Sequence, residues 1–90
     1  MSVRIQLEIM ATSVRAKVRG KQNAHYLEKQ VREAEFDDVV VKQPASGVEG
    51  INLWQVIVGR KPGGTVSDIV DFLKSSPNFE VASFDRKKGR

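Results

Sequence analysis

The regular alternation of apolar and polar residues near the start of the chain constrains its fold more than any other feature. Four apolar residues occupy odd positions and three polar residues occupy the even positions between them: Val3, Ile5, Leu7 and Ile9 against Arg4, Gln6 and Glu8. Successive side chains of a strand point to opposite faces, so the pattern predicts a half-buried strand over residues 3–9.

The alternation resumes on even positions at Val14, Ala16 and Val18. One continuous strand over residues 3–19 would be far longer than usual, so two interpretations remain. Either a turn or bulge near residues 10–13 resets the phase, or residues 11–19 form a helix that Gly20 ends. We favour the extended interpretation, because Val14 and Val18 are β-branched.

The remainder of the chain predicts two helices and three more strands. Residues 23–35 carry apolar residues at helical spacing after Asn23, a suitable N-cap, and residues 65–76 do so after Thr65. We expect strands over residues 39–43, 51–58 and 79–84, and a loop over residues 45–50. The aromatic residues Trp54, Phe72, Phe79 and Phe84 are expected in the core or at the edge of an oligomer contact.

This order of elements predicts the α+β class and a ferredoxin-like α/β plait. That fold has a βαββαβ core, in which an antiparallel sheet carries both helices on one face. A strand over residues 14–19 would be surplus to it, and we expect one N-terminal strand to extend a sheet edge or to pair with a second chain. The 90 residues predict a single domain over residues 1–85 with a basic tail over residues 86–90.

Composition excludes several kinds of chemistry. The chain has no cysteine, which removes disulfides, thiolate catalysis and cysteine-based metal sites. Its only histidine, His25, has no nucleophile in its predicted surroundings, so we expect no enzyme activity, no metal and no cofactor. No apolar run is long enough to cross a membrane, and we expect a cytoplasmic protein.

A basic stripe is the first candidate binding surface. Arg15, Lys17, Arg19 and Lys21 are spaced two residues apart, and on a strand they would form a positive row about 20 Å long at roughly 3.3 Å per residue. With the net charge of +4, the row suits an acidic protein or a phosphate backbone. No aromatic residue is interleaved for base stacking, and the alternative is a solvated strand face.

A glycine-rich connection at residues 59–65 is the second candidate. Arg60, Lys61, Gly63, Gly64 and Thr65 combine charge, backbone freedom and the start of a helix, which are the ingredients of an anion site. The Walker arrangement is absent, because Thr65 stands where lysine is required. The alternative is a simple strand-to-helix turn.

An acidic cluster lies at the C-terminal end of the first predicted helix: Glu33, Glu35, Asp37 and Asp38. Negative charge at a helix C-terminus opposes the helix dipole by about 0.3–1 kcal/mol per exposed residue. Solvation, a basic group from a neighbouring chain, or more remotely a divalent cation would compensate for it.

Together these features favour a small non-enzymatic regulatory or protein-interaction module that self-associates through its sheet, with a protein partner or a second copy as ligand. The first alternative is a nucleic-acid-binding domain that uses the basic stripe and tail. The second is a small-anion or phosphate-binding domain at residues 59–65.

Overall fold

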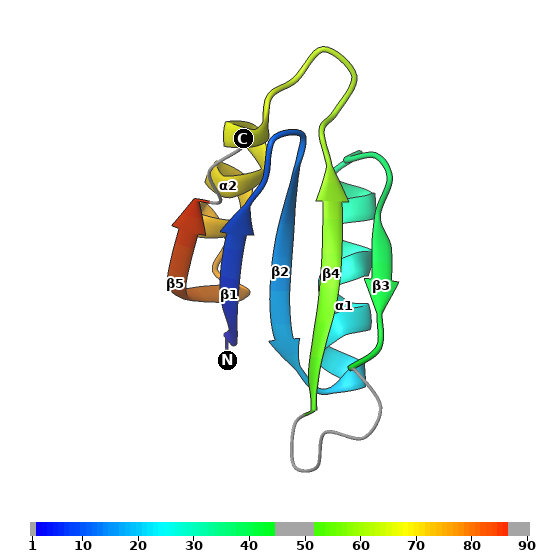
Figure 1. Ribbon diagram of the computed structural model, residues 1–90, viewed down its shortest axis with the longest axis vertical. Coiled ribbons are helices and arrows are strands. Elements are labelled where there is room, and N and C mark those ends of the chain that lie inside the picture. Colours follow the sequence, from blue (N-terminus) through cyan, green and yellow to red (C-terminus); the bar gives the residue numbers. More distant parts are fainter. Residues whose placement is uncertain (1, 45–51, 87–90) are drawn as a thin grey trace.

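The computed structural model describes residues 2–44 and 52–86, which form five strands and two helices (Figure 1). The elements in chain order are β1 (Val3–Ile9), β2 (Ser13–Arg19), α1 (Lys21–Glu33), β3 (Val40–Lys42), β4 (Leu53–Gly59), α2 (Val66–Ser75) and β5 (Phe79–Arg86). The predicted loop over residues 45–50 lies outside the described residues.

The extended interpretation of residues 13–19 is confirmed. β1 and β2 form an antiparallel hairpin in which Ile9 pairs with Val14 and Leu7 pairs with Ala16. The Met10 N–H donates a 2.9 Å hydrogen bond to the Ser13 carbonyl and closes the turn. Paired residues share a sheet face, so this register places the odd positions of β1 beside the even positions of β2. The phase shift in the sequence is therefore the mark of a hairpin.

The sheet has the strand order β3-β4-β2-β1-β5 (Figure 1). The α+β class is confirmed, but the topology is not the plain ferredoxin-like plait that we predicted. β2, α1 and β3 form one split β-α-β unit around β4, and β4, α2 and β5 form a second one. The second unit leaves room for two strands, β2 and β1, where the standard fold has one.

β1 fills that additional position, which corrects two predictions. It pairs antiparallel with β2 and parallel with β5, so the sheet is mixed and not antiparallel throughout. The surplus strand therefore neither extends an edge nor awaits a second chain. A hairpin places β1 directly beside β2, and the long crossover through α2 allows β5 to reach its far side.

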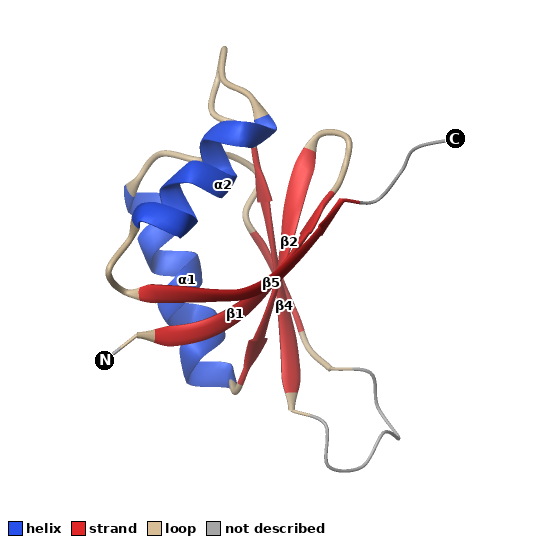
Figure 2. Cartoon of the chain, turned by 90° about the vertical axis from the view of Figure 1, so that its left-hand side faces the viewer, coloured by secondary structure: helices blue, strands red, loops and turns tan. Residues whose placement is uncertain are grey.

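Both helices cover the same face of the sheet, and no helix of the described chain covers the other face (Figure 2). The core forms between this face and the helices. It includes fully buried side chains from every layer: Ile5, Val14, Val18, Leu27, Val31, Val56, Val58, Ile69 and Leu73. Burying such aliphatic side chains stabilises the fold by about 1.5–3 kcal/mol each.

The first helix begins two residues earlier than predicted. Its N-cap is Gly20, whose φ of 91° few other residues adopt, and Asn23 instead donates a 3.0 Å side-chain hydrogen bond to the Arg19 carbonyl. At the other end of the helix Glu35 lies outside it, with φ at 70°. The N-cap at Thr65 is confirmed, because α2 begins at Val66.

The aromatic residues divide between the core and the surface. Phe79 is buried, Trp54 and Phe72 are half-buried, and Phe84 keeps 46% of its surface exposed. Arg86, which we assigned to the basic tail, is the last residue of β5, while residues 87–90 lie outside the described chain. No helix in residues 2–44 and 52–86 has the length and apolar character needed to cross a bilayer.

Candidate functional site

The side chains that point away from the helices form one continuous surface, which we call the open face. It is formed by Arg4, Gln6, Glu8, Ser13, Arg15, Lys17, Arg19, Val40, Lys42, Leu53, Gln55, Ile57, Glu80, Ser83 and Asp85.

Three of the four residues of the basic stripe lie on this face. Arg15, Lys17 and Arg19 alternate along β2 with the buried Val14, Ala16 and Val18. Lys21 does not belong with them, because the chain turns at Gly20 and Lys21 begins α1. The predicted four-residue row is therefore shortened to three.

Strand pairing surrounds these cations with neighbours that the sequence does not place. Arg15 lies opposite Glu8, and its guanidinium Nη1 donates a 2.9 Å hydrogen bond to the Glu8 carboxylate. Lys17 pairs with Gln6 of β1 on one side and with Gln55 of β4 on the other. Gln55 pairs in turn with Lys42 of β3. The charge of Arg15 is thus partly compensated, whereas Lys17 and Lys42 face solvent across an uncharged glutamine.

The open face changes character from one edge to the other. Glu80 and Asp85 place acidic groups on β5, and the cations of β2 occupy the centre. Beyond them, Ile57 pairs with Val40, which is 47% exposed, to give an apolar patch. The open face therefore combines an acidic edge, a basic centre and a small apolar patch.

Aromatic rings are missing from this face. All six aromatic side chains, Tyr26, Phe36, Trp54, Phe72, Phe79 and Phe84, lie on the helix side. Trp54, for example, pairs with Val18 on the buried side of the sheet, and its ring centre lies 6.2 Å from that of His25 on α1, with the two rings tilted by 55°. The open face therefore offers charge to a nucleic acid but no ring on which a base could stack.

The glycine-rich connection lies beside the acidic cluster. Arg60, Lys61, Gly63 and Gly64 line an open cavity of about 790 Å³ together with Asp37 and Asp38. The Lys61 ammonium sits 4.8 Å from the centre of the Phe36 ring. Two carboxylates at the same cavity repel the anion that the loop was expected to attract.

The start of α2 is also occupied by a residue of the chain itself. The Thr65 N–H donates a 3.0 Å hydrogen bond to the Asp68 carboxylate, which caps the helix. An incoming anion would compete with that carboxylate for the same positive end of the helix. The glycine-rich connection at residues 59–65 therefore has a structural role as the turn that leads into a capped helix.

One cation lies beside the acidic cluster at the C-terminus of α1. Arg32, in the last turn of α1, donates a 2.8 Å hydrogen bond to the Val39 carbonyl and a second to Glu28. This cation at the C-terminus of α1 favours the helix dipole that Glu33 and Glu35 oppose.

His25 belongs to a surface ion-pair network on α1. Its Nδ1 lies 3.0 Å from one Glu28 carboxylate oxygen, and Arg32 contacts the other oxygen at 3.1 Å. The hydrogen bond with His25 lowers the pKa of Glu28, burial acts in the opposite direction, and Arg32 lowers the pKa further. The described residues contain no group of three or more His, Cys, Asp or Glu side chains arranged to hold a metal ion.

The sequence missed Lys42 and the apolar patch as parts of the candidate site. They belong to this site because β3 lies beside β4, and only the pairing of these two strands in the folded chain shows this.

The chain matches no protein-family model, no curated protein and no solved structure.

Proposed function

We propose that this chain is a non-enzymatic protein-binding module whose open face docks an acidic protein surface. The observation that carries the proposal is the sheet face that no helix of the described chain covers, on which cations from β2 and β3 adjoin the exposed Val40 and the half-buried Ile57. Complementary charge steers such a partner and sets its orientation, while the apolar patch supplies area that is buried on binding.

A nucleic acid is the weaker ligand for this face. Phosphate binding depends on the number of cations available, and Glu8 already occupies Arg15. The acidic groups of β5 repel a backbone that extends across the sheet, and the face lacks an aromatic platform.

A second copy of the chain fits the same chemistry, because one copy carries both the basic centre and the acidic edge. The internal position of β1 removes the surplus-strand argument for self-association, so this form of the proposal depends on the charges alone. Light scattering at low and high salt tests it: a dimer that dissociates in salt identifies the partner as a second copy, and a monomer at both excludes a second copy.

The binding test uses the isotope-labelled full chain with poly-glutamate as an acidic polypeptide probe and duplex DNA as competitor. We expect poly-glutamate to shift the amide signals of Lys17, Lys42 and Gln55. Changing Lys17, Arg19 and Lys42 together to glutamate should weaken binding at least about tenfold, which is ~1.4 kcal/mol. A control with the same charge change, at Lys21, Lys29 and Arg60, should bind nearly as the parent does.

Two results would overturn the proposal. One is equal loss of binding in the two variants, because net charge and not the open face would then be responsible. The other is a preference for DNA over poly-glutamate at matched salt, which would favour the nucleic-acid function instead.

A further inference from the structure

The outer edge of β5 is an open strand edge. β5 pairs with β1 on one side only, and no strand of the described chain pairs with its other side. It is eight residues long, contains no proline, and is exposed from Ala82 to Arg86. Edge strands present unpaired backbone N–H and C=O groups, and proteins usually shorten or cover them. This edge is neither short nor covered within residues 2–44 and 52–86.

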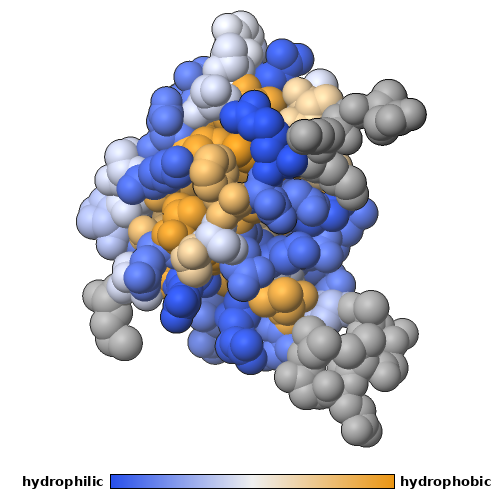
Figure 3. Space-filling model, turned by 60° about the vertical axis from the view of Figure 1, so that its left-hand side comes forward, coloured by the Kyte–Doolittle hydropathy of each residue, from blue (hydrophilic) through white to orange (hydrophobic). Residues whose placement is uncertain are grey.

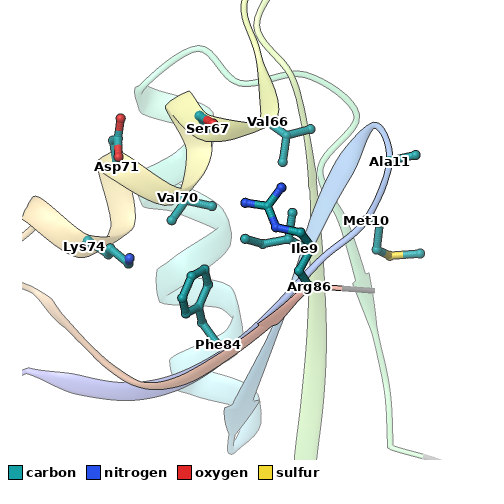
Figure 4. A pocket seen from close by; sticks show the side chains of 10 residues that line it. All are labelled: Ile9, Met10, Ala11, Val66, Ser67, Val70, Asp71, Lys74, Phe84 and Arg86. Carbon is teal, nitrogen blue, oxygen red and sulfur yellow. The ribbon is translucent and has the colours of Figure 1, made fainter. Parts of the chain in front are cut away.

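A groove follows this edge on the helix side of the sheet. Two adjoining cavities, of about 630 and 640 Å³, share Lys74 and Phe84 in their linings. The floor of the first is apolar and is made by Ile9, Val66, Val70 and Phe84 (Figure 4). The space-filling view from this side shows apolar surface enclosed by hydrophilic surface (Figure 3). We call this feature the β5 groove.

Two cations border the apolar floor. The Lys74 ammonium sits 4.2 Å from the centre of the Phe84 ring, and the Arg86 side chain extends toward Val66 and Ile9 (Figure 4). Neither cation has a carboxylate within ion-pair distance in the described part of the chain. Asp71 lines the same cavity but points away from Phe84, and Glu80 lines the second one. An anionic group is therefore attracted to the part of the groove at Val70 and Phe84, which Lys74 and Arg86 border from opposite sides (Figure 4).

We propose that the β5 groove binds an extended, acidic and apolar peptide segment of a partner protein, which adds to β5 as a sixth strand. The free edge would supply backbone hydrogen bonds, and side chains on alternate positions of the peptide would enter the groove. Aliphatic side chains would cover Val70 and Phe84, and a carboxylate would lie between Lys74 and Arg86.

A second copy of the chain fits this groove less well. An antiparallel pair of β5 strands with Phe84 opposite Phe84 would bring two Lys74 ammonium groups over adjacent rings. Like charges at such short range are destabilising, and no acidic residue of β5 faces the helix side to offset them. The charge of the groove therefore disfavours a second copy in this register and favours an acidic segment. The apolar floor and the two cations of the groove lie on the opposite side of the sheet from Lys17, Arg19 and Lys42, so this inference does not depend on the proposed function.

The test is fluorescence anisotropy with a labelled peptide about as long as β5, in which isoleucine and glutamate share one face and threonine forms the other. Two variants of the full chain address the groove: Phe84→Ala, and Lys74→Glu combined with Arg86→Glu. We expect each to weaken binding at least about tenfold. The matched control, Lys21→Glu combined with Lys29→Glu on α1, should stay within about twofold. The open-face variant of Lys17, Arg19 and Lys42 should also bind normally, so either proposal can be refuted without the other.

Two altered peptides test the mode of binding. Lysine in place of glutamate should reduce affinity at least about tenfold, because it meets Lys74 and Arg86. Proline at alternate positions should abolish binding, since it removes the N–H groups that a strand must donate. Equal binding of the proline peptide would exclude strand addition. No binding at millimolar peptide, or a dimer of the free chain that Phe84→Ala disrupts, would overturn the proposal.

Discussion

Replacing Gly59 by alanine tests how tightly the acidic turn packs on the end of β4. Gly59 is buried, and its N–H donates a 2.8 Å hydrogen bond to the Asp37 carbonyl. A Cβ atom at this position would lie 2.7 Å from that carbonyl oxygen and 3.1 Å from the Asp38 Cβ. The nearest atom is backbone, so no flexible side chain can move away to make room.

The magnitude follows from three effects. Overpacking of this kind costs about 1–3 kcal/mol, and displacing the Asp37 carbonyl weakens a hydrogen bond whose net value is about 0.5–1.5 kcal/mol. Alanine restricts the unfolded chain and returns about 0.4–1 kcal/mol. We therefore expect a net loss of about 2 kcal/mol, which corresponds to a fall in Tm of roughly 8–16 °C for a domain of this size.

Urea unfolding of the full chain, followed by circular dichroism, measures this loss. Gly63→Ala is the matched control, because Gly63 has a φ of 75° but no atom within 4 Å of the added Cβ. It should cost the strain of left-handed backbone, about 1–2 kcal/mol, less the same ~0.4–1 kcal/mol from the restricted unfolded chain, which leaves a net loss of about 1 kcal/mol. A Gly59→Ala protein within about 0.5 kcal/mol of the parent would refute the close contact between β4 and the turn.

Three further predictions concern the helices. Leu27→Ala should lower the free energy of unfolding by about 2–5 kcal/mol in urea, since Leu27 is fully buried and leaves a cavity. Asp68→Ala should cost about 0.5–2 kcal/mol in thermal unfolding because α2 loses its cap, and an unchanged Tm would contradict this. The lowered pKa of Glu28 stabilises the folded state above the ordinary value of 4.5, and this contribution is lost as pH falls through the lower folded pKa. Glu28→Gln should therefore flatten the dependence of stability on pH below about 4.5, and a slope equal to the parent's would exclude the effect.

Local pattern determined the elements of this fold and the faces of its strands. Alternation at residues 3–9 and 14–18 placed Arg15, Lys17 and Arg19 together on one side of a strand, as the structure confirms. The helix ends were less well determined. Gly20 as N-cap and the left-handed Glu35 depend on how the neighbouring strand and turn pack, and not on capping preference alone.

Strand order was decided by tertiary structure. The alternation of residues 3–9 does not distinguish an edge strand from one paired on both sides. Side chains point to the two faces of the sheet and so reflect burial of those faces, whereas neighbouring strands pair through the backbone. The position of β1 between β2 and β5 fixes the composition of the open face and leaves the outer edge of β5 free. The sequence by itself thus predicted most of the extended, helical and buried residues, which depend on near neighbours along the chain, and left only residues 11–19 open between strand and helix. Only the folded chain decided which strands adjoin, because that choice depends on contacts between residues far apart in sequence.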